Sequence, residues 1–303
     1  MADSRTLGPE AERQESLKAI RPLTLEEFVG QDGIKERLRI YIQAAKERGE
    51  PLDHVLLLSP PGLGKTTLAY LIARELGVNL FATSGPALET PSDLVGILTK
   101  LGRRDVLFID EVHRLHPKLE EYLYAAMEDY VVDLIIDKGP NARTVRLALQ
   151  PFTLVGATTR EGLLSDPFRA RFGVLEKLMP YPPEVLARIV ERSAQKLAVK
   201  IEKKASFLLA ARSRGTPRIA NRFLRRIRDM AQMAGIEMIN EEFVKEGLRR
   251  LGVDEDGLDP TDRRILSLVA AQGGRPVGLK TIAVALGEEE RTCLLYTSPS
   301  PRD

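Results

Sequence analysis

One stretch, SPPGLGKTT at positions 59–67, constrains most strongly what this chain can fold into. The apolar run directly before it predicts a buried strand, and the residues after it predict a helix. Between the two, Gly62 and Gly64 let backbone N–H groups wrap around a triphosphate, where a Cβ atom would collide with it. Lys65 can reach the β- and γ-phosphates, and the Thr66 hydroxyl can bind Mg²⁺. The stretch therefore predicts a phosphate-binding loop.

The loop departs from the full pattern G-x-x-x-x-G-K-[ST] at its first position, where this chain has Ser59. Among residues with a side chain, a small one disturbs the loop least at this position, so the prediction of a phosphate-binding loop stands. The alternative is a glycine-rich turn that happens to precede a helix. The helix after the loop continues in amphipathic fashion from Thr67 until Gly77, a residue typical of a helix end.

Composition limits the class of protein. A chain of 303 residues favours two or three domains, and 43% hydrophobic with 29% charged residues is typical of a soluble globular protein. The net charge is only +2, so a nucleic-acid partner would need a local basic patch. The single cysteine, Cys293, excludes an internal disulfide. With no apolar run of membrane length and no signal peptide, the expected location is cytoplasmic.

Short apolar runs predict the sheet. They recur at 80–83, 106–109, 152–157 and 174–179, with helical patterns between most of them. This alternation favours an α/β fold with a parallel sheet covered by helices on both faces. Another segment, 131–149, predicts an inserted β-hairpin with apolar residues on both faces. Packing on the parent domain and docking of a partner protein explain those residues equally well.

The remaining boundaries come from proline, charge and composition. Two prolines after Tyr181 end the large domain, an all-helical segment follows, and an acidic hinge precedes two short helices that indicate a partial winged helix. The Ser/Pro-rich end has no third helix or wing and is interpreted as a non-native tail or a disordered one. The predicted parts are a disordered arm at 1–18, a large α/β domain at 19–180, a helical lid at 181–253, a partial winged helix at 254–291 and the tail at 292–303.

Two carboxylates follow the apolar run at 106–109, at the strand end where ligands bind in open parallel sheets. Asp110 is predicted to hold Mg²⁺ through water, and Glu111 to deprotonate the attacking water. Thr158, at the end of another strand, is predicted to sense the γ-phosphate, with a plain strand-end threonine as the alternative. Arg171 can neutralise a phosphoryl group on a neighbouring subunit, although an isolated arginine is more often a surface ion-pair residue.

Other polar residues carry weaker signals. His113 and His116 are three residues apart, but no cysteine or second carboxylate cluster completes a metal site, so both are assigned to structure. Thr216 and Pro217 predict a helix N-cap and first turn. Ten basic residues against one acidic between 200 and 228 can bind DNA phosphate, line a nucleotide or form a solvated face.

Taken together, these stretches resemble the RuvB family, the AAA+ motors of Holliday-junction branch migration. The similarity covers about residues 21–290 and is carried by PPGLGKTT at 60–67, LFIDEVHRL at 107–115, AMEDY at 126–130, GATTR at 156–160, RFG at 171–173 and RGTPRIANR at 214–222. The resemblance implies an AAA+ P-loop domain, a small all-α lid and a winged helix. It also implies an ATP hydrolase that acts on junction DNA during recombination and repair.

The resemblance also implies roles for residues. Thr158 would be sensor 1, Arg171 a finger acting in trans, and Arg218 sensor 2 acting in cis. ATP would be bound by Ile20, Arg21, Gly62, Gly64, Lys65, Thr66, Thr67, Asp129, Tyr130, Val131, Arg171, Tyr181 and Arg218, and Mg²⁺ by Thr66 and Asp110.

Partners follow from the same resemblance. The family forms a homo-hexameric ring around Holliday-junction duplex DNA, RuvA would dock on the hairpin at 131–149, and the RuvC resolvase could join. Two features depart from the family: Ser59, and the loss of the pattern after Arg291, which removes the wing arginines. A nucleotide switch, such as a clamp loader or replication initiator, is the alternative function. A GTPase is disfavoured because no Asn-Lys-x-Asp stretch occurs.

Overall fold

The computed structural model describes residues 20–135, 144–273 and 275–287. It divides into two compact units, one of residues 21–179 and one formed by residue 20 and the residues from 180 on. The predicted arm at 1–18, the hairpin tip at 136–143 and the tail at 292–303 with Cys293 lie outside the described residues.

A five-stranded parallel sheet forms the centre of the first unit, with strand order β2-β3-β6-β1-β7. The three central strands are almost completely buried because helices cover both faces, which is why they read as continuous apolar runs. The prediction of a parallel sheet is confirmed. The strands are β1 (Val55–Leu58), β2 (Leu80–Ser84), β3 (Val106–Asp110), β6 (Thr153–Thr158) and β7 (Val174–Lys177).

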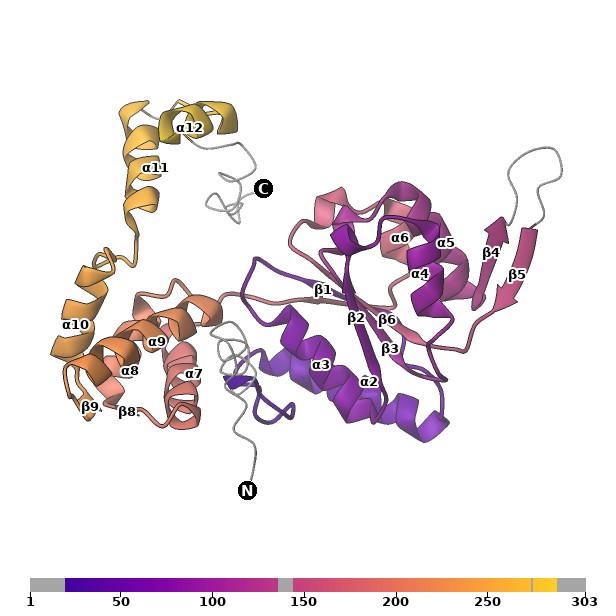
Figure 1. The fold of residues 1–303 in the computed structure, drawn as a ribbon, viewed down its shortest axis with the longest axis horizontal. Helices are drawn as coiled ribbons and strands as arrows, with labels where there is room; N and C mark the ends of the chain where they lie inside the picture. The colour runs from indigo at the N-terminus through magenta and orange to yellow at the C-terminus, as the bar shows by residue number, and fades with distance from the viewer. Residues whose placement is uncertain (1–19, 136–143, 274, 288–303) are drawn as a thin grey trace, which may run out of the picture. The chain divides into compact units, whose positions relative to one another are not determined.

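Helices lie on both faces of this sheet (Figure 1), with α2 and α3 on one side and α4 and α5 on the other. As predicted, α3 ends at Gly77, and α2 ends at Gly49; both glycines have the left-handed conformation that glycine adopts without a Cβ penalty. The helices are α2 (Asp32–Arg48), α3 (Lys65–Leu76), α4 (Pro91–Leu98), α5 (Pro117–Glu128) and α6 (Asp166–Ala170). Short 3-10 turns are η1 (Gly85–Ala87), η2 (Val112–Arg114) and η3 (Glu161–Leu163).

The predicted hairpin is present as β4 (Val131–Ile135) paired antiparallel with β5 (Thr144–Ala148). Its base packs on the parent domain, since Val132 and Leu149 are buried in the core shared with α5 and Phe152. Further out, an exposed ion pair joins Asp133 and Arg146 across the two strands. The first of the two explanations for its apolar residues is therefore confirmed for the base, and docking of a partner stays a prediction.

Helices dominate the second unit. Four of them, α7 (Pro183–Lys196), α8 (Lys203–Ala211), α9 (Pro217–Met233) and α10 (Glu241–Arg250), pack together, and β8 (Lys200–Ile201) pairs with β9 (Met238–Ile239). Helix α9 begins at the predicted position. Thr216 is its N-cap and Pro217 its first residue, as predicted, although the Thr216 hydroxyl donates to the Arg214 carbonyl (3.3 Å) and makes no capping bond to the helix.

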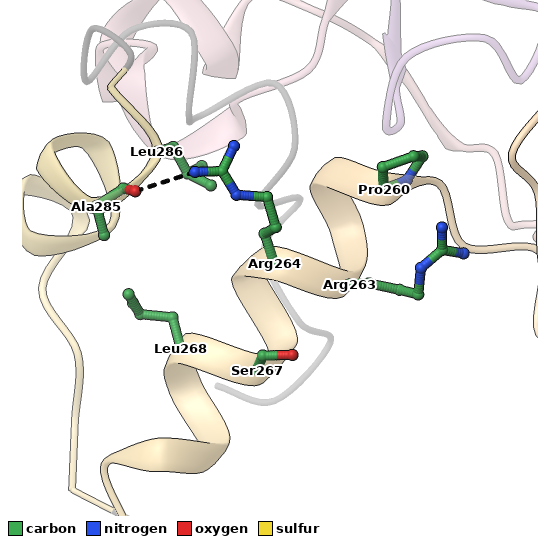
Figure 2. Close-up of a pocket in the computed structure, with 7 residues that line it drawn as sticks. All are labelled: Pro260, Arg263, Arg264, Ser267, Leu268, Ala285 and Leu286. Atoms are coloured by element: carbon green, nitrogen blue, oxygen red, sulfur yellow. Dashed lines mark hydrogen bonds between the residues drawn. The ribbon is translucent and has the colours of Figure 1, made fainter.

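The end of the described chain holds α11 (Pro260–Ala271) and α12 (Leu279–Leu286), the two short helices expected from the sequence. They share a small apolar cluster around Ile265 and Ile282. Residues of both helices line a hollow of about 520 Å³, and Figure 2 shows Arg264 there donating to the Ala285 carbonyl. Whether the pair forms part of a winged helix stays a prediction. None of the described helices is long and apolar enough to span a bilayer.

A buried histidine joins three elements of the first unit. The Leu154 N–H of β6 donates to His54 Nδ1 (2.8 Å), and His54 Nε2 lies 3.1 Å from the Met127 carbonyl of α5. Because Nδ1 accepts, the ring hydrogen is on Nε2 and the imidazole is neutral. Burial lowers the pKa of His54 below its ordinary value of 6.5, so protonation favours the unfolded chain.

We therefore expect the melting temperature of the first unit to fall as the pH is lowered through 6.5. Each unit of pKa difference corresponds to about 1.4 kcal/mol, present above pH 6.5 and lost as the pH falls below it. His54→Asn, which does not titrate, should melt lower at neutral pH but show a smaller further loss on acidification. Thermal melts at matched pH values test this, and equal pH slopes in the two proteins would contradict it.

Candidate functional site

The phosphate loop lies between β1 and α3 as predicted. Gly62 and Gly64 have φ angles of 86° and 111°, which residues with a Cβ rarely adopt, so both glycines are required by the turn. Lys65 is the first residue of α3 and is buried. The Ser59 N–H donates to the Thr158 carbonyl (3.2 Å), which attaches the start of the loop to the end of β6.

Lys65 is held by the loop itself. Its Nζ donates to the Ser59 carbonyl (2.7 Å), the Ser59 hydroxyl oxygen (3.1 Å) and the Pro60 carbonyl (3.2 Å). Ser59 is not among the residues with positive φ, so a side chain causes no backbone strain at this position. The serine that departs from the family pattern therefore fits the loop and adds an oxygen partner for the lysine.

The two predicted Mg²⁺ ligands come together. The Thr66 hydroxyl donates to Asp110 Oδ2 (3.2 Å), although the residues are 44 positions apart in the chain. In the described part of the chain no group of three or more His, Cys, Asp or Glu side chains could hold a metal. This donor set fits Mg²⁺, which proteins usually bind through one or two side chains, with phosphates and water completing the octahedron.

Glu111 follows in a sharp turn, with φ 49° in the left-handed region. Such a conformation is uncommon for a residue with a side chain and is found preferentially at functional sites. The carboxylate is 35% exposed. Its Oε2 accepts from the Thr159 hydroxyl (3.2 Å) and lies 3.3 Å from His113 Nε2.

Thr158 is fully buried at the end of β6, between β1 and β3 in the sheet. Its Oγ1 accepts from the Arg160 N–H (3.0 Å) and lies 2.8 Å from His113 Nδ1. The strand order thus brings Lys65, Asp110, Glu111 and Thr158 to one edge of the sheet.

His113 is the residue of this cluster that the sequence interpretation missed. Its side chain, 5% exposed, lies between Glu111 and Thr158, and burial lowers its pKa while the Glu111 carboxylate opposes this shift. The one available signal was its position just after the carboxylate pair. His116, by contrast, is structural as predicted: its Nδ1 accepts from the Lys118 N–H at the start of α5 (3.3 Å).

Arg171 lies just after α6 and is paired within its own chain. Its guanidinium stacks 4.3 Å above the Tyr124 ring, forms an ion pair with Glu128 (3.2 Å) and donates to the Pro167 carbonyl (2.6 Å). Its Nε is buried and has no hydrogen-bond partner among the described residues. The Tyr124 hydroxyl is fixed in turn by Glu120 Oε2 (3.1 Å).

The predicted residues Asp129, Tyr130 and Val131 lie where α5 passes into β4, directly after the Glu128 that pairs with Arg171. Tyr130 has a positive φ of 52°, and its ring packs edge-on against Phe152. Arg21, also in the first unit, stacks over Tyr70 at 5.5 Å.

The other predicted nucleotide-binding residues belong to the second unit. The Ile20 carbonyl accepts from Arg192 of α7 (3.1 Å), and the Tyr181 N–H donates to the Gly215 carbonyl (2.9 Å). Arg218 is exposed in the first turn of α9, just after Gly215. Ile20 is thus attached to α7, and Tyr181 to the loop before α9.

Comparison with known proteins gives a consistent result. Residues 20–178 match the Holliday junction DNA helicase RuvB P-loop domain, and residues 181–254 match the RuvB AAA lid domain. The chain is 57% identical over 274 residues to the Holliday junction branch migration complex subunit RuvB of Methanoregula boonei, covering 90% of this chain and 82% of that protein. It is 53% identical over 291 residues to the same subunit of Flavobacterium johnsoniae, covering 96% and 86%.

Solved structures agree. The structure titled Thermotoga maritima RuvB Holliday junction branch migration motor superimposes with a TM-score of 0.82 at 46% identity, covering 94% of each chain. A mutant of the same protein gives a TM-score of 0.84 at 47% identity, covering 92% of this chain and 89% of the other. The chain belongs to the RuvB family of AAA+ P-loop proteins.

Proposed function

We propose that this chain is an ATP-hydrolysing motor that drives branch migration of Holliday junctions during recombination and repair. One observation supports this most directly: Lys65, Thr66, Asp110, Glu111 and Thr158 gather at the carboxyl edge of a parallel sheet in a chain of this family. A clamp loader or replication initiator is not favoured, since the curated relatives are named as branch migration subunits.

ATP binding is assigned to the phosphate loop. Backbone N–H groups around Gly62 and Gly64 would hold the phosphates, and Lys65 would exchange its contacts to Ser59 and Pro60 for phosphate oxygens. Thr66 and Asp110 would hold Mg²⁺, the latter through water. When bound, this ion supplies positive charge beside the phosphate oxygens.

Hydrolysis is assigned to Glu111 and Thr158. The carboxylate takes a proton from water while the water oxygen forms a bond to the γ-phosphorus. The bond from that phosphorus to the β–γ bridging oxygen breaks, leaving ADP and phosphate. The Thr158 hydroxyl would donate to a γ-phosphoryl oxygen as sensor 1.

Further residues would complete the site from other parts of the assembly. Arg171 would act in trans on a neighbouring subunit's ATP, and Arg218 in cis as sensor 2. Ile20 and Arg21 would line the adenine pocket, with Tyr181 nearby. The remaining nucleotide contacts are assigned to Thr67, Asp129, Tyr130 and Val131.

The assembly proposed for this chain is a homo-hexameric ring on Holliday-junction duplex DNA in the cytoplasm. The β4–β5 hairpin would dock RuvA, with RuvC as a further partner. Val145 and the ion-paired Asp133 and Arg146 are exposed on the hairpin, which supports that assignment. Helices α11 and α12 are proposed as the first part of a winged helix.

Replacing the proposed base should separate binding from turnover. Glu111→Gln keeps a side chain of the same size but cannot take a proton at neutral pH, so ATP binding should remain and hydrolysis fall by about 10²-fold or more. A fluorescent ATP analogue measures binding, and phosphate release measures turnover. Substantial hydrolysis by this variant would contradict the assignment of Glu111.

Arg171 can be tested by mixing subunits. Arg171→Ala alone should lose most hydrolysis, because removal of an arginine finger costs about 10³-fold or more. Mixed rings that also contain Glu111→Gln subunits, which carry an intact Arg171, should regain activity, since each variant supplies what the other lacks. The matched control mixes Arg171→Ala with the double variant, and recovery in that control, or none in the test mixture, would count against the trans role.

The motor function itself is tested on a four-way junction. ATP with RuvA should drive branch migration by this chain and by this chain extended with the complete winged helix of a relative. Glu111→Gln in the same extended chain is the matched control and should leave the junction in place. If the extended chain hydrolyses ATP but never moves the junction, the nucleotide-switch alternative is preferred.

A further inference from the structure

His113 has no part in the ATPase assignments above, yet its ring touches two of their residues. It lies in η2, in the turn that follows the carboxylate pair. One ring nitrogen, Nδ1, is 2.8 Å from the Thr158 hydroxyl, and the other, Nε2, is 3.3 Å from the Glu111 carboxylate. A buried ring with a polar partner at each nitrogen has a defined orientation.

The positions of the hydrogens follow from the partners. A carboxylate is negatively charged and only accepts hydrogen bonds, so the ring carries its hydrogen on Nε2, the nitrogen that lies 3.3 Å from Glu111. Burial lowers the pKa of His113, which leaves the neutral ring with Nδ1 as an acceptor. Nδ1 therefore accepts from the Thr158 hydroxyl, which itself accepts from the Arg160 N–H (3.0 Å).

In this arrangement the Thr158 hydroxyl donates its hydrogen to His113 Nδ1. A hydroxyl has one hydrogen, so Thr158 can donate to His113 or to a phosphoryl oxygen, but not fully to both. When the hydrogen turns to a phosphoryl oxygen, Nδ1 is left as a buried acceptor without a donor, which is unfavourable. Movement of the imidazole ring is then favoured, and the contact between its Nε2–H and Glu111 changes with it.

The backbone around Glu111 cannot take up that change. The Glu111 N–H is bound by Asp110 Oδ1 (3.0 Å), and its carbonyl accepts from the Arg114 N–H (2.9 Å). A Cβ at Gly85 would lie 2.5 Å from the same carbonyl, so η1 packs directly against it. The part that can respond is the partly exposed carboxylate group, whose Oε2 also accepts from the Thr159 hydroxyl (3.2 Å).

We propose that His113 is a positioning residue that makes the orientation of the Glu111 carboxylate depend on where Thr158 directs its hydroxyl hydrogen. The inference deepens the proposed ATPase function and depends on it. The base is then oriented for water only after Thr158 has engaged a phosphoryl oxygen.

A double-mutant cycle tests this coupling in the whole 303-residue chain. The variants are His113→Asn, Thr158→Val and both together, and the measurements are single-turnover hydrolysis and ATP affinity. We expect His113→Asn to slow hydrolysis on the order of 10- to 100-fold, the cost of a misplaced catalytic group, while ATP affinity changes less than about twofold. The double variant should be at least about threefold more active than the product of the two single effects predicts.

Matched variants separate positioning from a structural role. His113→Gln can keep a donor toward Glu111, whereas His113→Asn can keep only an acceptor toward Thr158, so both should lose the coupling. Thr158→Ser keeps the hydroxyl and should restore coupling that Thr158→Val removes. A purely structural histidine would change melting temperature and affinity without this dependence on the Thr158 hydroxyl.

A structure of the wild-type chain with Mg²⁺ and a non-hydrolysable ATP analogue tests the same point without any variant. The expected result is a Thr158 hydroxyl within hydrogen-bond distance of the γ-phosphoryl oxygen and a reoriented Glu111 carboxylate.

Fully multiplicative effects in the cycle, or an unchanged Glu111–His113 contact beside the analogue, would overturn the inference while leaving the ATPase assignment intact. A wild-type chain that hydrolyses no ATP would overturn both.

Discussion

The position of β6 between β1 and β3 is the constraint on which the site depends. Leu58 at the end of β1 pairs with Thr158, and Ile109 at the end of β3 pairs with Gly156. Because parallel strands end at the same edge, this register puts the phosphate loop, the carboxylate pair and the buried threonine next to one another. A shift of one residue in β6 would turn Thr158 to the opposite face.

At this edge of the sheet, three polar side chains bind partners within the protein that they could exchange for a nucleotide. Lys65 holds loop carbonyls, the Thr66 hydroxyl holds Asp110, and the Thr158 hydroxyl holds His113. Each of these contacts uses a group that a triphosphate or its metal ion would also bind. Polar groups buried in this way must be paired in every state, so nucleotide binding replaces one set of hydrogen bonds with another.

Arg171 shows the same principle on the surface proposed to face a neighbouring subunit. Besides the hydrogen bond to the Pro167 carbonyl, its contacts are an ion pair with an exposed Glu128, worth about 0–1 kcal/mol, and a cation–π contact with Tyr124, worth about 0.5–2 kcal/mol. Interactions of this size hold the guanidinium in place without preventing its transfer to a more highly charged phosphoryl group. The proposed role in trans requires that these contacts be exchanged for contacts to the phosphoryl group.

The sequence by itself determined the features that local backbone chemistry controls. Gly62 and Gly64 specify the loop, Gly49 and Gly77 specify helix ends, and uninterrupted apolar runs specify buried strands. It also identified the family, because the motifs of that family occur in this chain.

Only the tertiary structure decided which side chains meet. His113 and Thr158 are 45 residues apart, and their contact exists because β6 inserts between two strands that precede it in the chain. The contacts of Arg171 with Tyr124 and Glu128 were unpredictable for the same reason, since they depend on where distant segments pack and not on spacing along the sequence.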